Sequence, residues 1–331
     1  MSDSPLIAAL CLCGFPLLAT AALVRAADHE DLPPSHSVTP ELYATGFEFA
    51  EGPAFDAAGN LYVVNYRGNG NIGQIAPDGT ARVFVDLRKV APHEERQPQA
   101  NGLKIDREGR LIAADSGAGR LLRIAADGSS AEVLADGANG RRFNSINDVA
   151  LDLQGNIYFS DPGGSNADNA IGAVYRYDIT SAQVAQLAGE LAFPNGLGVT
   201  PDQKHLCVCE SQRYQLLIFD VQEDGTVANQ RVLIEFPREN SGELVGGLYD
   251  PDGLIFDQQG RAYVAMWTGG VINVVDVATG TLIRQYNAGG SQATNVHFHD
   301  GYLYTTVATK EAVFRLPLGI EGFDYNGSPA Q

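Results

Sequence analysis

The sequence predicts an all-β protein, a six-bladed β-propeller with four-stranded blades. Six stretches share one pattern, in which a polar or acidic residue, usually followed by glycine, precedes two alternating apolar runs separated by a glycine-containing turn. Successive stretches begin about 42 to 57 residues apart, the range expected when each repeat forms one blade. Because the repeats are equivalent, we expect their first residues to surround one central channel as a ring of oxygen-bearing side chains. These residues are Glu51, Asn101, Asn147, Asn195, Asp252 and Thr294.

Residues 1–26 are predicted to be an export signal rather than part of the fold. The run from Leu6 to Val24 is almost wholly apolar or small, and the small residues around Ala26 are typical of a cleavage site. An uncleaved membrane anchor is the alternative. Such an anchor needs roughly 20 apolar residues, and Gly14 and Pro16 interrupt this run.

Residues 27–37 are polar and contain two prolines, a composition that predicts a leader to the folded part. Residues 38–331 are predicted to be a single β-propeller domain, because a chain of this length suits a core that is divided among blades. We expect the protein to be exported, either periplasmic or secreted, and to be free of the membrane once the signal is cleaved. We also expect a monomer or a weak oligomer.

The strands of the last repeat are one short of a blade, which predicts how the ring closes. The last repeat ends near Leu316, while the segment Glu41 to Phe47 precedes the first repeat and alternates like a strand. We expect this segment to supply the outer strand of the last blade, because the blade would otherwise keep an open edge.

Residues 87–99 could form a short helix or an excursion over the channel mouth. Two polar, glycine-containing loops, residues 163–172 and 238–249, are of the kind that carries specificity.

The charge of the chain limits the class of partner. A formal net charge of −18 argues against nucleic acid and anionic membranes, since both favour Lys and Arg. It is compatible with a bound cation, and a small-molecule substrate is the expected partner.

Cys207 and Cys209 lie on one face of a predicted strand, a spacing that is poor for a mutual disulfide. Two packed thiols are expected.

Five motifs, in this order along the chain, resemble those of one known family. They are Glu51-Gly-Pro, Arg142-Phe-Asn-Ser-Ile-Asn147-Asp-Val, Phe159-Ser-Asp161-Pro, Pro194-Asn195-Gly-Leu and Pro251-Asp252-Gly-Leu. Their order resembles that of the gluconolactonase, regucalcin and luciferin-regenerating-enzyme family of six-bladed propellers, over roughly residues 40–318. One departure is Ile146, which stands where the family often has proline before the Asn-Asp pair.

This resemblance implies a catalytic divalent cation, commonly calcium, at the mouth of the channel. Four residues match the family's ligands: Glu51, Asn147, Asn195 and Asp252. It also implies hydrolysis of lactones or, as in the diisopropyl-fluorophosphatase relatives, of phosphorus esters.

The chemistry of these four residues agrees with that implication. Two carboxylates and two amide oxygens form an all-oxygen set that suits Ca²⁺, Mg²⁺ or Mn²⁺. Among these ions the family resemblance favours calcium, and Zn²⁺ is the less suited alternative. Glu51 and Asp252 together would neutralise one divalent ion, and four protein ligands leave positions open for water and substrate.

The expected reaction is opening of a lactone ring, with a gluconolactonase-like sugar lactone as the expected substrate, by a metal-polarised carbonyl and an activated water. Asp252 is the predicted general base, and Asp148, beside Asn147, is the rival base because a metal ligand has a lowered pKa. Asn101, Arg142 and Asn144 are the predicted substrate contacts.

Other functions fit the same pattern. Taken singly, each of these residues is more typical of a turn than of a site, and only their repetition in register favours a metal. A phosphotriesterase-like hydrolase on the same metal site is one alternative. A non-catalytic propeller that binds calcium or another ligand is the second, because a scaffold can keep a site and lose turnover.

Overall fold

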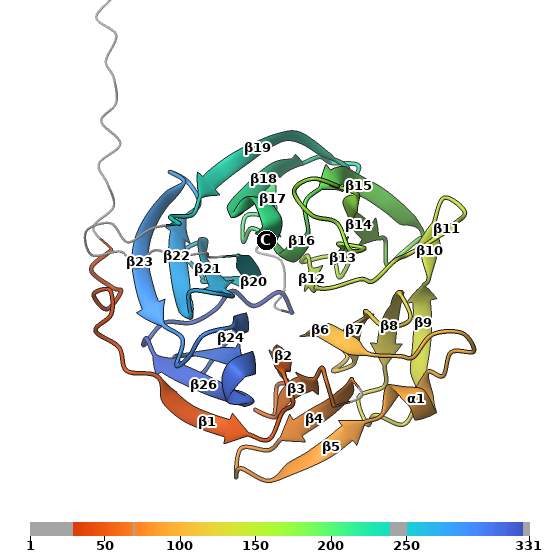
Figure 1. The fold of residues 1–331 in the computed structure, drawn as a ribbon, viewed down its shortest axis with the longest axis horizontal. Helices are drawn as coiled ribbons and strands as arrows, with labels where there is room; N and C mark the ends of the chain where they lie inside the picture. The colour runs from red at the N-terminus through yellow and green to blue at the C-terminus, as the bar shows by residue number, and fades with distance from the viewer. Residues whose placement is uncertain (1–28, 69, 239–249, 327–331) are drawn as a thin grey trace, which may run out of the picture. The chain divides into compact units, whose positions relative to one another are not determined.

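Six antiparallel sheets of four strands each surround a central channel in the computed structural model (Figure 1). The structure describes residues 29–68, 70–238 and 250–326. Within this part of the chain, helical structure is limited to α1 (Leu87–Val90) and the 3-10 turns η1 (Ser211–Arg213) and η2 (Ala308–Lys310). The predicted six-bladed propeller is therefore confirmed.

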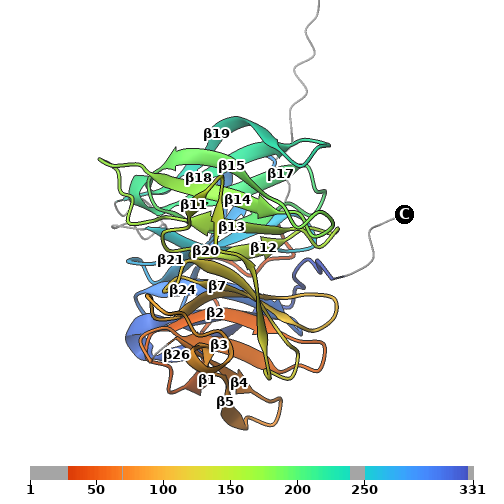
Figure 2. The same cartoon turned by 90° about the vertical axis from the view of Figure 1, so that its right-hand side faces the viewer.

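The strands follow one another from the channel outward in each blade. The first blade consists of β2 (Ala50–Phe55), β3 (Leu61–Asn65), β4 (Asn71–Ile75) and β5 (Ala81–Val85). The second consists of β6 (Ala100–Ile105), β7 (Leu111–Asp115), β8 (Arg120–Ile124) and β9 (Ala131–Ala135). The third consists of β12 (Val149–Leu151), β13 (Ile157–Asp161), β14 (Gly172–Tyr177) and β15 (Val184–Leu191). The last three are β16 (Pro194–Val199), β17 (His205–Glu210), β18 (Gln215–Val221) and β19 (Val227–Glu235); β20 (Pro251–Phe256), β21 (Arg261–Met266), β22 (Val271–Asp276) and β23 (Thr281–Asn287); and β24 (Ala293–His299), β25 (Tyr302–Val307), β26 (Ala312–Pro317) and β1 (Glu41–Thr45). A small hairpin of β10 (Gly137–Ala138) and β11 (Arg141–Arg142) precedes the third blade. Turned by 90°, the ring of blades is seen from its side, with β19 at the top and β5 at the bottom (Figure 2).

The turn between the first two strands of a blade explains the repeated Asp and Gly of the sequence. In four blades an aspartate accepts the backbone N–H groups two and four residues later, as Asp56 does from Ala58 and Asn60 at 2.9 Å each. The glycine in this turn has a positive φ, +79° at Gly59 and +75° at Gly109, which other residues rarely adopt. The repeated pattern thus encodes one turn conformation.

Apolar side chains fill the space between neighbouring sheets rather than one central core. Between the first two blades, for example, the buried side chains of Tyr62 and Ile72 share a cluster with Leu103 and Leu111. Cys207 and Cys209 are buried free thiols in the cluster between the fourth and fifth blades. The expectation of two packed thiols is confirmed.

The ring closes as predicted. β1 pairs antiparallel with β26, with Glu41 opposite Arg315 and Thr45 opposite Ala312. A side-chain contact adds to this joint, because the Thr294 hydroxyl of the sixth blade donates to the carbonyl of Ala50 in the first blade at 2.9 Å. β26 is therefore paired on both sides, and the last blade has four strands like the others.

The residues before β1 also contact the propeller. Leu32 is buried in the cluster between the fifth and sixth blades, and the hydroxyl of Tyr286 donates to the carbonyl of Pro33 at 2.8 Å. The N–H of His36 donates to the carbonyl of Gln285 at 2.9 Å. The second half of the predicted leader thus packs along β23 instead of standing clear of the fold.

The predicted export signal, residues 1–26, lies outside the described residues, as does most of the predicted loop 238–249. In the described ranges no helix has the length and apolar character needed to cross a membrane.

The segment after β26 crosses the end of the channel at which the inner strands finish. Gly322 forms a bridge with Asp257, the N–H of Phe323 donates to the carbonyl of Phe256 at 2.9 Å, and the amide of Asn326 donates to the carbonyl of Ile105 at 2.9 Å. We call residues 319–326 the crossing segment. It reaches from the sixth blade to the second and covers a cavity of about 380 Å³ that Lys104, Ile255 and His297 also line.

Candidate metal centre

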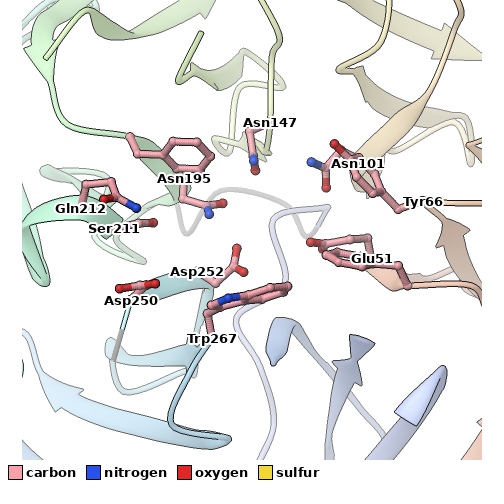
Figure 3. A pocket seen from close by; sticks show the side chains of 12 residues that line it. Glu51, Tyr66, Asn101, Asn147, Asn195, Ser211, Gln212, Asp250, Asp252 and Trp267 are labelled. Atoms are coloured by element: carbon pink, nitrogen blue, oxygen red, sulfur yellow. The ribbon is translucent and has the colours of Figure 1, made fainter. Parts of the chain in front are cut away.

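A pocket of about 250 Å³ opens at the end of the channel where the inner strands begin. Five of the six predicted ring residues line it and surround a common space (Figure 3). They are Glu51, Asn101, Asn147, Asn195 and Asp252. The four predicted metal ligands are among them, although they come from four different blades.

A β-bulge recurs where the inner strand carries its ring residue. The register between the first and second strands shifts between Glu51 and Ala54 in the first blade and between Pro251 and Leu254 in the fifth. The same shift occurs in the second, fourth and sixth blades. Because a bulge rotates the strand locally and re-aims one side chain, it can turn each ring residue toward the channel.

Three buried carboxylates hold the segments that lead to the asparagines of the ring. Each stands at the end of the second strand of its blade. Asp115 accepts the N–H of Gln99 at 2.8 Å, Asp161 accepts the N–H groups of Asn144 and Ser145 at 2.8 and 2.9 Å, and Glu210 accepts the N–H of Ala192 at 2.7 Å. Asn101, Asn147 and Asn195 follow these segments within a few residues. Of the three, only Asp161 is part of a motif that the sequence analysis identifies.

The two ring carboxylates are buried without a compensating positive charge. Glu51 is 6% exposed and Asp252 is 8% exposed. Burial, and then the negative charge of Asp148, raises the pKa of Glu51 to about 8. Burial, and then the charge of Glu51, raises the pKa of Asp252 well above its ordinary range. In the described part of the chain neither carboxylate forms an ion pair with Lys or Arg.

These observations fit a bound divalent cation. Two carboxylates that share a buried space repel each other unless a positive charge lies between them. Within the described residues no three His, Cys, Asp or Glu side chains cluster closely enough to hold a metal by themselves. A cation here would therefore take Glu51 and Asp252 together with the amide oxygens of Asn147 and Asn195, the hard oxygen set that calcium prefers.

The sixth ring position differs from the prediction. Thr294 is fully buried and does not line the pocket. Its hydroxyl lies 2.6 Å from that of Thr306, and its hydrogen bond with Glu51 offsets a small part of the rise in the pKa of Glu51. Thr294 therefore contacts Glu51 without facing the pocket.

The predicted substrate contacts are only partly assembled. Asn101 lines the pocket. Arg142 is exposed on β11 and forms an ion pair of 3.3 Å with Glu95, while the backbone carbonyl of Asn144 accepts from Arg96. Neither Arg142 nor Asn144 lines the pocket, so their contact with substrate stays a prediction.

Seven residues of the pocket wall were missed by sequence reasoning. They are Phe49, Tyr66, Phe193, Ser211, Gln212, Asp250 and Trp267. Most lie in the loops that join strands at this face of the propeller, where no repeat signal marks them. One signal was available: Phe49, Phe193 and Asp250 each stand two residues before a ring residue.

Comparison with known proteins was made with the sequence and with the fold. The model of the SMP-30/Gluconolactonase/LRE-like region matches residues 49–309. A gluconolactonase of Zymomonas mobilis is 27% identical over 242 residues, which cover 68% of this chain and 66%, just under two thirds, of the relative. The diisopropyl-fluorophosphatase of Loligo vulgaris is 28% identical over 273 residues, 75% of this chain and 82% of the relative. The crystal structure of a calcium-binding protein, regucalcin, from Agrobacterium tumefaciens superposes with a TM-score of 0.70 at 18% identity, covering 88% of this chain and 98% of that one.

Proposed function

The chain belongs to the SMP-30/Gluconolactonase/LRE-like family, and from this membership together with the pocket we propose that it is a divalent-cation-dependent hydrolase that opens a lactone ring. One observation carries the proposal. Glu51 and Asp252, both buried and without a basic partner in the described residues, face the amides of Asn147 and Asn195 across one pocket. Such a set is costly unless a cation occupies it.

Calcium is the proposed cation. The oxygen-only donor set favours a hard ion, and a structural neighbour is described as a calcium-binding protein. Bound at these four residues, the cation supplies Lewis acidity to a lactone carbonyl and stabilises negative charge on its oxygen.

Asp252 is the proposed general base. It lines the pocket, whereas Asp148 does not, and both oxygens of Asp148 already accept hydrogen bonds. Asp252 takes a proton from the attacking water as the water oxygen bonds to the carbonyl carbon. The bond to the ring oxygen then breaks, and the proton passes from Asp252 to that oxygen. The product is a hydroxy acid.

The pocket wall supports a polar cyclic substrate, of which sugar lactones are the proposed class. Phe49, Tyr66 and Trp267 offer aromatic faces, and Ser211 and Gln212 offer hydrogen-bonding groups (Figure 3). A relative in the same family is named a gluconolactonase. Apolar rings with a few placed polar groups are the usual lining of a small-molecule site.

A phosphorus ester is the second candidate substrate. It is favoured by the similarity to diisopropyl-fluorophosphatase, which extends over 82% of that relative. Hydrolysis of such an ester would use the same pocket and the same cation, with attack at phosphorus instead of carbon.

The test is a substrate comparison on purified protein. Glucono-δ-lactone, δ-valerolactone and diisopropyl fluorophosphate are each assayed in calcium and in EDTA, with Glu51→Gln as the matched variant. We expect calcium-dependent opening of a lactone that is lost in EDTA. Equal rates in EDTA and calcium would overturn the metal-dependent mechanism, and hydrolysis of the phosphorus ester alone would favour the second candidate.

A further inference from the structure

The layer of the channel below the ring is nearly closed by backbone. In four blades the residue after the ring residue is glycine, namely Gly52, Gly102, Gly196 and Gly253. A Cβ atom on Gly52 would lie 2.3 Å from the carbonyl oxygen of Asn101, and one on Gly196 would lie 2.3 Å from the carbonyl oxygen of Asp252. Side chains are therefore excluded from this layer in four of the six blades.

The two remaining blades fill that layer. Asp148 of the third blade and Asn295 of the sixth blade stand where the others have glycine, and these two blades lie opposite each other in the ring (Figure 1). The amide nitrogen of Asn295 donates to a carboxylate oxygen of Asp148 at 3.1 Å. We call this pair the strut. Asp148 is 1% exposed and Asn295 is 3% exposed.

The orientation of both partners is fixed by their own backbone. One oxygen of Asp148 accepts the N–H of Val149 at 2.8 Å, and the amide oxygen of Asn295 accepts the N–H of Val296 at 2.9 Å. The amide nitrogen of Asn295 is thereby left to face the second oxygen of Asp148. The neighbouring glycines pack closely against both side chains, because a Cβ on Gly102 would lie 2.1 Å from Asp148 and one on Gly253 would lie 2.3 Å from Asn295.

We propose that the strut holds Asp148 as a fixed third negative charge beneath the ring, which increases the affinity of the metal centre for divalent cations without Asp148 acting as ligand or base. The inference rests on the proposed function, since it concerns the same cation. Asp148 does not line the pocket, so it acts through its charge. That charge lies next to the ring, because Asp148 directly follows Asn147 and packs against Gly102, the residue after Asn101.

A buried charge acts strongly on a neighbouring cation because little water screens the interaction. Groups just outside a metal's ligands commonly change its affinity by about 10- to 100-fold. A charge held by hydrogen bonds also costs no rearrangement when the cation arrives. The role of Asn295 is that of a positioning residue, which keeps the carboxylate of Asp148 in place across the channel.

An exchange of the two side chains tests the charge directly. In Asp148→Asn the layer loses one negative charge. In the double variant Asp148→Asn/Asn295→Asp the carboxylate moves from the third blade to the sixth, while one amide-to-carboxylate hydrogen bond and the total charge are kept. Asp152→Asn is the matched control, because Asp152 is a buried carboxylate of the same blade at the opposite end of its inner strand.

The readout is cation binding, independent of turnover. Calcium affinity is measured by calorimetry, and Tb³⁺ binding by luminescence sensitised through Trp267, the one tryptophan of the sequence and a residue of the pocket wall. We expect Asp148→Asn to weaken calcium binding about 10- to 100-fold, and the double variant to recover to within about threefold of the parent. Asp152→Asn should bind like the parent. Melting curves show whether each variant is folded. Asn295→Ser replaces the amide donor by a shorter side chain and keeps the charge of Asp148, so it should lose about threefold in calcium affinity and serves as the test if Asp148→Asn does not fold.

Each result decides the matter. Equal calcium affinity of the parent and Asp148→Asn would overturn this inference and leave the proposed function standing. A double variant that binds calcium as weakly as Asp148→Asn would do the same. Unchanged binding by Asn295→Ser would remove the positioning role of Asn295. A parent that binds no divalent cation at all would overturn the proposed function first, and the strut would then have no cation to serve.

Discussion

The rings of Phe49 and Trp267 lie 5.3 Å apart, centroid to centroid, although one residue precedes the inner strand of the first blade and the other follows β21 of the fifth. Phe49 lies at the same distance from Tyr66, and the guanidinium of Arg67 stacks over its outer side at 4.7 Å. Three aromatic rings from two blades thus form one continuous wall of the pocket.

This wall is expected to bind the face of the substrate ring. Trp267→Ala should raise KM for the preferred lactone about 2- to 10-fold with little change in kcat, since aromatic contacts contribute roughly 0.5–1.5 kcal/mol. Trp267→Phe keeps a ring and should recover most of the loss. Steady-state kinetics of the two variants measure the difference, and an unchanged KM in Trp267→Ala would place the substrate elsewhere in the pocket.

Removal of one ring charge should weaken the cation. Glu51→Gln keeps an oxygen and nearly the same shape, but it halves the neutralising charge of Glu51 and Asp252. Calorimetry should show weaker calcium binding. A ligand that binds only the native state stabilises it more as its concentration rises above its Kd, so at the same concentration calcium should raise the melting temperature of the parent more than that of the variant. Equal shifts in both proteins would contradict the assignment of Glu51.

The contribution of Glu51 to the pH dependence of stability should differ between the metal-free and the calcium-bound protein. The pKa of Glu51 rises from 4.5 to about 8 in the native protein, through burial and then the charge of Asp148. Between these pH values the metal-free native state holds a proton that the unfolded chain has released, so its free energy of unfolding should fall as pH rises. Calcium displaces that proton and should stabilise more at pH 8 than at pH 5.

Melting temperatures in EDTA and in calcium, from pH 5 to pH 8, measure this effect. Other groups also titrate in the range, so the quantity of interest is the difference between the parent and Glu51→Gln. A metal-free parent that gains stability over this range relative to the variant would show that Glu51 is ionised without the cation.

Asp252 should matter more for turnover than for binding. Asp252→Asn keeps an oxygen ligand but cannot accept a proton, so kcat should fall about 10²- to 10⁴-fold under confirmed calcium saturation. Asp148→Asn should keep most of its kcat under the same condition, because calcium excess compensates for lost affinity. Near-parental rates in both variants would exclude a carboxylate base, and loss in Asp148→Asn alone would make Asp148 the base.

Truncations from the N-terminus should show graded effects. Removal of residues 1–31 should leave stability unchanged, while removal of residues 1–37 should lower the melting temperature, because Leu32 and the contacts of Pro33 with β23 are lost. Removal of residues 1–47 should prevent folding, since β26 would lose its partner strand. Identical melting of the first and third truncations would contradict the role of β1 in closing the ring.

The parts of the structure that repeat were predictable from the sequence. Asp56 and Gly59, with their counterparts in other blades, mark the turn in each repeat, and the turn fixes the register of the first two strands. The positions of the ring residues follow from that register. Closure by β1 followed from the missing strand of the last blade.

The pocket wall and the strut could not be predicted in the same way. Trp267 and Tyr66 lie in loops whose course depends on tertiary contacts between blades. The pairing of Asp148 with Asn295 joins residues 147 positions apart, and nothing in either local sequence specifies the partner. Thr294 fits the repeat but does not line the pocket, because the pattern encodes backbone position and not side-chain contacts.

The crossing segment lies across the end of the channel opposite the metal centre. Residues 319–326 contact the fifth and second blades there, so we expect substrate to enter and product to leave at the end where the pocket of the metal centre opens. A carboxylate product on its way out and fresh substrate on its way in would compete for one passage. We therefore expect the product to inhibit competitively, since product and substrate would meet at the pocket that Glu51 and Asp252 line.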